Sequence, residues 1–116
     1  MSPPVRRVAV ILSGCGVHDG SEIHEAVLAL LALDRAGARV VCAAPNAPQT
    51  HVVNHFTGEV APLETRNTLV ESARIARGAA VDLAGLRAAD VDAAFFPGGF
   101  GATKNLSDYA TRARDA

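Results

Sequence analysis

The sequence predicts an α/β fold built on an open, doubly wound parallel sheet with helices on both faces. Continuous apolar runs without alternation surround Val10, Val41 and Phe95, as is typical of strands that are buried on both sides of a sheet. Stretches in which apolar residues recur with the helical period separate these runs. Glycine-rich loops follow the first and the last run, at the carboxyl ends where the ligand sites of such sheets lie.

The first strand is expected within residues 5–12, and a glycine-rich loop follows it at 13–20. A helix comes next, and either Asp19 or Ser21 can cap its first turn. Its inward face is marked by apolar residues three and four positions apart, which are Ile23, Ala26, Val27, Leu30 and Leu31. Gly37 is expected to end this helix in a left-handed conformation.

A second buried strand is predicted at 40–44, and it completes a βαβ unit with a right-handed crossover. The stretch that follows, as far as Leu63, has no helical period, and Val52-Val53 is its candidate strand. A second helix is predicted over 65–77, where Gly78 stops it.

The last strand is predicted at 91–96, and its loop at 97–101 turns into a final helix from about Asn105. This loop and the loop at 13–20 both leave the carboxyl ends of predicted parallel strands. If those two strands are neighbours in the sheet, the two loops meet at one site.

Composition narrows the classes of protein. A length of 116 residues allows one domain, and 49% hydrophobic residues allow a substantial core. The formal net charge is −1 and no basic block occurs, which argues against a nucleic-acid partner. The longest apolar runs fall well short of the roughly 18 residues that a membrane-spanning helix needs, so no membrane partner is expected.

The potential metal ligands and thiols show no metal-binding pattern. Cys15 and Cys42 have neither the number of a disulfide framework nor the spacing of a zinc site. The four histidines have no ligand spacing on one helix either. No metal is therefore expected, and a soluble, reducing compartment, the cytoplasm, is expected by elimination.

The glycines of the first loop resemble a dinucleotide-binding motif only in part. Gly14 and Gly16 have the right spacing, but Gly20 comes one residue too late for the third glycine. The second strand also ends without the acid that would bind a ribose hydroxyl. No nicotinamide cofactor is therefore expected, and a module that holds a flavin or nucleotide phosphate remains an alternative.

The residues alone leave two interpretations open for each candidate site residue. Glu25, in the first helix, is either a solvated carboxylate that favours the helix dipole or a proton carrier. Gly98 and Gly99 offer backbone N–H groups to an oxyanion, or serve only the geometry of a turn. Cys15 either lines the same site, where it could also serve as a nucleophile, or is an ordinary buried thiol.

Several stretches, in order along the chain, match the pattern of one known family. They are 11–16, 19–27, Asn54-His55 with 57–59, 64–67, 73–75 with Arg77-Gly78, and 97–102 with 104–106. In these stretches the chain resembles the ElbB-type glyoxalase group of the PfpI-like, class I glutamine-amidotransferase-like superfamily. The resemblance implies a flavodoxin-like fold. It also implies an enzyme that needs no cofactor and converts glyoxal and water to glycolate through a hemithioacetal on a cysteine.

The resemblance also implies roles for residues of this chain. Glu25 matches the glutamate that binds the thiol and moves protons, and Gly99, beside Gly98, matches the glycine whose N–H stabilises the oxyanion. The family's cysteine lies beyond the position that matches Ala116, so neither Cys15 nor Cys42 corresponds to it. We therefore expect residues 1–116 to be the N-terminal portion of a single domain and to be inactive alone.

The complete domain is expected to act on a small aldehyde and to form a homo-oligomer. The alternative to an enzyme, besides the flavin or nucleotide module, is an interaction or regulatory protein that has the same fold and is linked to isoprenoid metabolism.

Overall fold

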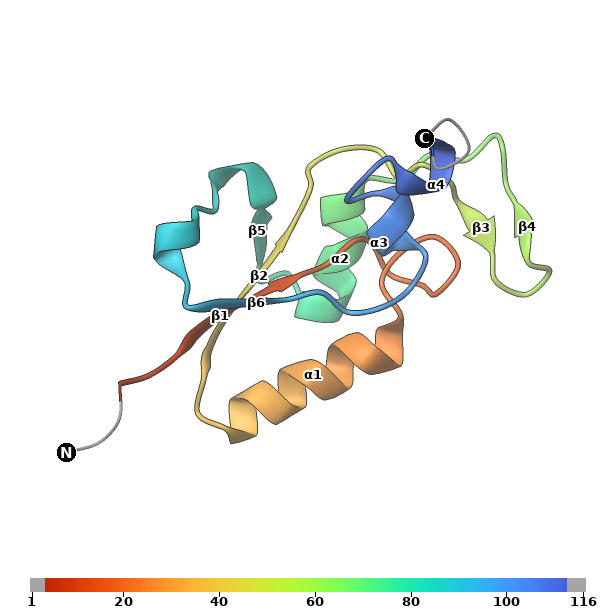
Figure 1. Ribbon diagram of the computed structural model, residues 1–116. Helices are drawn as coiled ribbons and strands as arrows, with labels where there is room; N and C mark the ends of the chain where they lie inside the picture. The colour runs from red at the N-terminus through yellow and green to blue at the C-terminus, as the bar shows by residue number, and fades with distance from the viewer. Residues whose placement is uncertain (1–3, 113–116) are drawn as a thin grey trace.

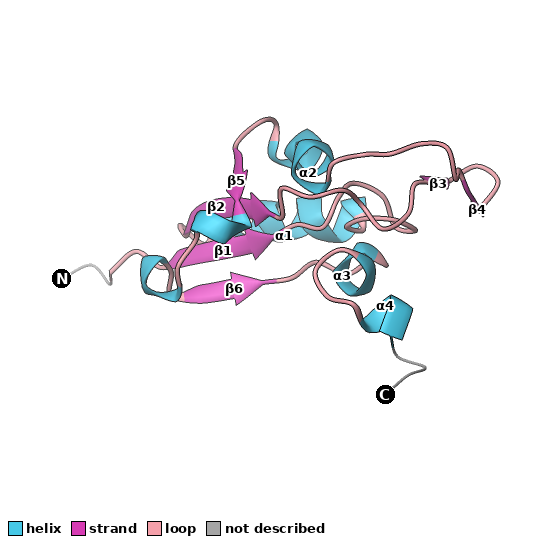
Figure 2. Ribbon diagram, turned by 90° about the horizontal axis from the view of Figure 1, so that it is seen from above, coloured by secondary structure: helices cyan, strands magenta, loops and turns pink. Residues whose placement is uncertain are grey.

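The computed structural model describes residues 4–112 and contains a four-stranded parallel sheet (Figure 1). The strands lie in the order β5-β2-β1-β6, which Figure 2 shows from above. Their bounds are β1 (Arg7–Ile11), β2 (Arg39–Ala44), β5 (Ala80–Asp82) and β6 (Ala93–Phe95). All three pairings are parallel, so the predicted α/β class with a doubly wound parallel sheet is confirmed.

Helices and short turns connect these strands. They are α1 (Ile23–Arg35), α2 (Thr68–Ala76), the 3-10 turns η1 (Leu83–Gly85) and η2 (Ala88–Asp90), α3 (Gly101–Lys104) and α4 (Tyr109–Arg112). A small antiparallel hairpin of β3 (Val53–Asn54) and β4 (Glu59–Val60) projects from the sheet. Within 4–112, no helix combines the length and apolarity needed to cross a bilayer.

The core lies on the two faces of the sheet. On one face, Val10 and Leu12 are fully buried against α1 and α2, and Figure 1 shows α1 running below the strands. On the other face, Ala9 and Ile11 pack against the segment that carries η1 and η2, together with Leu106. In the part of the chain that the structure describes, both long helices therefore cover the same face.

The order of the strands explains this arrangement. The chain passes from β1 to β2 and then to β5 in one direction across the sheet, through α1 and α2. It then returns past β1 to β6, in the opposite direction. Because parallel crossovers are right-handed, this return must cross the opposite face, where η1 and η2 lie.

The N-terminus of helix α1 differs from the prediction, and so does that of α2. Helix α1 is capped by Glu22, whose carboxylate accepts from the N–H of Glu25 at 2.8 Å, so neither Asp19 nor Ser21 is its cap. The Asp19 carboxylate instead accepts from Val53 N at 2.8 Å, and Ser21 Oγ accepts from Ser13 N at 2.9 Å. These two buried side chains fix the loop, which leaves the cap to Glu22.

Other boundaries have equally local causes. Helix α2 begins at Thr68 rather than near 65, because Asn67 Oδ1 caps Val70 N at 2.9 Å. Strand β5 was not predicted from the sequence, because a strand of three residues carries little pattern. The prediction that the final helix starts at about Asn105 is wrong. Helix α3 ends at Lys104, and α4 begins at Tyr109. Gly37 has φ 77° after α1, as predicted.

Candidate functional site

The loops that follow β1 and β6 interlock, because the two strands are neighbours in the sheet. Glu22 N donates to Gly98 O at 2.7 Å, and Phe100 N donates to Val17 O at 2.8 Å. The Asn105 amide adds a side-chain bridge, since its Nδ2 donates to Ser13 O at 2.7 Å and to Asp19 O at 2.8 Å. The prediction that the two glycine-rich loops meet is therefore confirmed.

The Glu25 carboxylate lies directly against the backbone of Gly98. A Cβ built on Gly98 would come within 2.6 Å of Glu25 Oε2 and 3.0 Å of Oε1. Only glycine fits there while Glu25 keeps its position. The Glu25 side chain is exposed and, among residues 4–112, accepts no hydrogen bond. Its carboxylate is therefore free to meet a reacting group beside Gly98.

Glu22 holds the two parts of this arrangement together. Its carboxylate accepts from Glu25 N, and its own N–H donates to Gly98 O, so one residue contacts both the helix start and the second loop. The hydrogen bond with the His24 ring and the one from Glu25 N hold the pKa of Glu22 below its usual range. Glu22 is thus an ionised cap, and the dipole of the helix stabilises a negative charge at this end.

The Gly99 backbone has a conformation and a position that exclude other residues. Its φ is 110°, and a Cβ on it would come within 2.6 Å of Glu22 N. Within the described part of the chain, the N–H groups of Gly98 and Gly99 have no hydrogen-bond acceptor. Two unshielded donors therefore lie next to the Glu25 carboxylate, which is an arrangement suited to an oxyanion.

Cys15 lines a cavity that Glu25, Gly98 and Gly99 do not line. A polar cavity of about 480 Å³ lies beside the first loop, and its lining includes Cys15 and Arg74 but none of those three residues. Burial raises the pKa of the Cys15 thiol, and the nearby Arg74 guanidinium only partly opposes this. A protonated thiol is a weak nucleophile, so the environment of Cys15 does not activate it.

An ion network not recognised from the sequence forms one wall of this cavity. Glu71 is buried, with an exposed fraction of 6%, and accepts from Arg66 Nη1 and Arg74 Nε, each at 2.8 Å. Burial alone would raise the pKa of Glu71, but the hydrogen bonds from Arg74 and Arg66 outweigh burial and leave that pKa low. The three-residue spacing of Glu71 and Arg74 in the predicted helix was the feature of the sequence that could have indicated this ion pair.

His55 takes a structural role at the edge of the cavity. His55 Nε2 accepts from His18 N at 3.2 Å, so its hydrogen is on Nδ1, which donates to Val53 O at 3.0 Å. Within 4–112, no three His, Cys, Asp or Glu side chains are grouped so that they could hold a metal ion.

Comparison with known proteins identifies close relatives, although no family model matches the chain. The chain is 58% identical over 112 residues to human "Glutamine amidotransferase-like class 1 domain-containing protein 3, mitochondrial" and to rat "ES1 protein homolog, mitochondrial". It is 41% identical to zebrafish "ES1 protein, mitochondrial". Each match covers 93–97% of this chain but 42% of the relative. The chain thus spans less than half the length of the relatives it matches.

A solved structure from Ehrlichia chaffeensis, described as an isoprenoid biosynthesis protein with an amidotransferase-like domain, has the same fold. It superposes with a TM-score of 0.83 at 52% identity, over 85% of this chain and 47% of that one. This agreement confirms the flavodoxin-like α/β fold.

The cytoplasmic location expected from the sequence is wrong. The human, rat and zebrafish relatives all carry "mitochondrial" in their names. The expectation rested on elimination, and the mitochondrial interior is also an aqueous compartment, so the surface and cysteine content of a domain do not distinguish the two.

Proposed function

We propose, from the premise that this chain is part of a class I glutamine amidotransferase-like domain, that the complete domain is a cofactor-independent glyoxalase. Its reaction would convert glyoxal and water to glycolate. The observation that carries the proposal is the Glu25 carboxylate, which lies against Gly98 without a hydrogen-bond donor among residues 4–112. A carboxylate so placed beside free N–H donors suits proton transfer at an aldehyde carbon.

The chemistry requires a thiol, which residues outside this chain would supply. The thiolate attacks one aldehyde carbon of glyoxal, and the new carbon–sulfur bond leaves an alkoxide, which is protonated to the hemithioacetal. A proton then leaves the carbon that bears sulfur, and a proton is delivered to the neighbouring carbon through an enediol. The product is a thioester of glycolate. Water hydrolyses it to glycolate and regenerates the thiol.

Each residue of the candidate site would have a defined role in this reaction. Gly98 and Gly99 would donate their N–H groups to the oxygen that becomes negative after attack. Glu25 would accept the proton of the thiol and then move the proton between the two carbons. Glu22 would be a positioning residue, because it holds Glu25 N and Gly98 O at once.

The alternative functions receive unequal support. A cradle for a flavin or nucleotide phosphate would use the glycine N–H groups of both loops, and those of the first loop are occupied. There, Gly14 N donates to Ser72 Oγ, Gly16 N to Ser21 O and Gly20 N to Gly16 O. A non-catalytic role in isoprenoid metabolism has one observation in its favour, which is the description of the Ehrlichia chaffeensis structure.

The test uses a chimera in which residues 1–116 are joined to the C-terminal part of the human relative. We expect the chimera to form glycolate from glyoxal, also after dialysis against a chelator, and the 116-residue chain alone to form none. Glycolate is measured by chromatography. A folded chimera without turnover would contradict the proposal, and activity that disappears on chelation and returns with added zinc would contradict the mechanism.

A further inference from the structure

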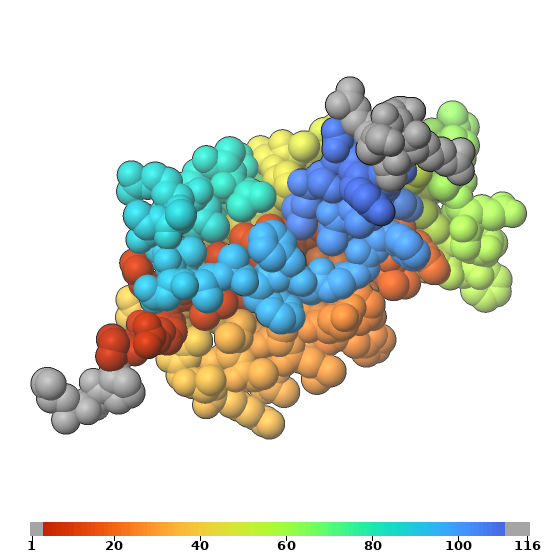
Figure 3. Space-filling model, viewed as in Figure 1, coloured from red at the N-terminus to blue at the C-terminus, as the bar shows by residue number. Residues whose placement is uncertain are grey.

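The polar cavity beside the first loop lies between three segments that the fold brings together. Besides the first loop, they are the segment that contains the β3–β4 hairpin and the segment that leads into α2. Figure 3 shows the hairpin segment, in green, at one end of the molecule. Val53 N donates to Asp19 Oδ2 at 2.8 Å, and Gly14 N donates to Ser72 Oγ at 2.8 Å. These bonds hold the hairpin segment and α2 against the first loop, so the cavity is part of the folded structure.

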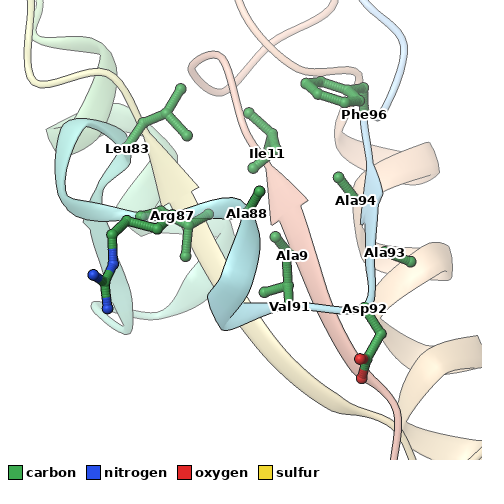
Figure 4. Close-up of a pocket in the computed structure, with 11 residues that line it drawn as sticks. Ala9, Ile11, Leu83, Arg87, Ala88, Val91, Asp92, Ala93, Ala94 and Phe96 are labelled. Atoms are coloured by element: carbon green, nitrogen blue, oxygen red, sulfur yellow. The ribbon is translucent and has the colours of Figure 1, made fainter.

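The walls of this cavity differ in chemistry from those of a second cavity of comparable size. The second cavity, of about 380 Å³, is lined mainly by apolar side chains (Figure 4). The charged groups of Arg87 and Asp92 point away from these side chains in Figure 4, and Asp92 accepts from Arg7 N at 2.8 Å. The polar cavity, of about 480 Å³, has the size of a small-molecule site, and charged side chains line it.

The basic wall of the polar cavity, which consists of Arg66, Arg74 and the Glu71 carboxylate between them, contains unused donors. Glu71 accepts from both arginines, so each of its oxygens is occupied and both guanidinium groups are held in place. Arg74 uses only its Nε in this contact. Within the described part of the chain, Nη1 and Nη2 of Arg74 have no acceptor. Parallel N–H groups on one guanidinium match the two oxygens of a carboxylate.

The acidic wall is the buried Asp19 carboxylate, which has an unused acceptor. Asp19 is 5% exposed, and only its Oδ2 accepts a hydrogen bond, from Val53 N. The one basic group within 4 Å among residues 4–112 is the His55 ring, whose Nε2 is 3.8 Å from Asp19 Oδ1 and accepts from His18 N instead. A buried acceptor without a donor is unfavourable, so a hydroxyl or ammonium group of a ligand would be stabilised there.

Cys15 lies between these two walls. Burial raises the pKa of its thiol most, the Arg74 guanidinium lowers that pKa, and the carboxylates of Glu71 and Asp19 raise it further. Charges of both walls therefore act on one sulfur atom. A ligand that lies against this thiol can contact both walls at once.

We propose that the polar cavity is a second small-molecule site, for a short carboxylate that also carries a hydroxyl or an ammonium group. The carboxylate of the ligand would accept from Nη1 and Nη2 of Arg74, and its hydroxyl or ammonium group would donate to Asp19 Oδ1. Three carboxylates and two guanidinium groups line the cavity. A simple anion would therefore meet repulsion that a ligand with a donor group offsets. The inference does not rest on the glyoxalase proposal, because it uses no residue of that site.

The test measures binding of small carboxylates to the chimera by titration in ligand-observed NMR. Glycolate and 3-hydroxypropionate carry a hydroxyl group, and glycine and β-alanine carry an ammonium group. Acetate and propionate are the matched carboxylates without a donor. We expect saturable binding in which a probe with a donor binds at least about fivefold more tightly than the matched carboxylate, because it satisfies Asp19 Oδ1. The tighter of the hydroxyl and ammonium probes identifies the donor group.

Variants assign this binding to the cavity. Asp19→Asn keeps an acceptor for Val53 N but removes the negative charge, so it should reduce the preference for donor-bearing probes to within about twofold. Arg74→Lys keeps a cation beside Glu71 but loses the parallel N–H groups, so it should weaken every probe at least about fivefold. Arg77→Gln is the matched control, since Arg77 is exposed at the end of α2 and does not line the cavity. It should leave each affinity within about twofold.

Melting temperatures establish that the variants are folded. Three results would overturn the proposal: no saturable binding to the folded chimera, acetate and propionate that bind as tightly as their donor-bearing counterparts, or equal affinities of the parent and Arg74→Lys. Binding is measured without turnover. A chimera that is inactive on glyoxal can therefore still confirm this site, and an active chimera can still overturn it.

Discussion

At the scale of single residues, the candidate site consists of a carboxylate and of two backbone N–H groups that have no acceptor among residues 4–112. The sequence indicated Glu25, Gly98 and Gly99 as candidates, and the structure brings all three together. It separates Cys15 from them, in a cavity built from segments far apart in the chain. No sequence spacing could reveal that cavity, because its walls approach one another only in three dimensions.

Substitution of Gly98 by alanine should reduce glyoxal turnover by the chimera with little loss of stability. The new Cβ would overlap the Glu25 carboxylate and displace it, whereas the backbone conformation of Gly98 is one that alanine adopts. We expect a loss of at least about tenfold in kcat/KM, which corresponds to about 1.4 kcal/mol of transition-state stabilisation. Steady-state kinetics and thermal unfolding measure the two effects.

Gly37→Ala is the control, because it should lower stability and leave the activity unchanged. Nothing lies within 4 Å of a Cβ at Gly37, but its φ of 77° is unfavourable for alanine. This variant should lose about 1–2 kcal/mol of stability and keep its kcat/KM. If Gly98→Ala proved as active as the parent, the Glu25 carboxylate would not need its position against Gly98.

At the scale of elements, the long apolar runs and the helical period were sufficient for β1, α1, β2 and β6, and the glycines marked the helix ends. Short elements were not predictable, because the three residues of β5 and the 3-10 turns depend on the strands already in place. The N-terminus of α1 was misplaced for a related reason. The two loop side chains able to cap it, Asp19 and Ser21, instead accept hydrogen bonds from Val53 N and Ser13 N.

The ion network of α2 should make stability depend on pH. The pKa of Glu71 is lower in the folded protein than in the unfolded chain, so its contribution is present above about pH 4.3 and is lost as pH falls through the folded pKa. Glu71→Gln should cost about 1–3 kcal/mol near neutral pH. The difference from the parent should shrink on acidification, as measured by denaturant unfolding.

Glu64→Gln removes the other partner of Arg66 and serves as the comparison, because Glu64 is exposed. An exposed ion pair contributes little, so its cost should stay below about 1 kcal/mol at every pH. Equal losses in the two variants would show that burial of Glu71 between two arginines has no special importance.

At the scale of the whole molecule, strand order is what creates the site. The sequence predicted that the two glycine-rich loops would meet only if their strands were neighbours, and the return of the chain past β1 makes β6 that neighbour. Among residues 4–112, the same return leaves an apolar cavity on one face of the sheet and an outer edge of β6 without a strand partner. Compartment was not predictable in the same way, since it depends on targeting rather than on the folded core.

The most direct measurement of the central claim is glycolate formation by the chimera with Glu25→Gln, next to Glu59→Gln as an exposed carboxylate outside the site. The loss of a general acid–base residue should lower the rate by about 10²–10⁴-fold. We expect that loss for Glu25→Gln at an unchanged melting temperature, with Glu59→Gln as active as the parent. A Glu25→Gln chimera that kept its full rate, or lost rate only in proportion to unfolded protein, would contradict the account.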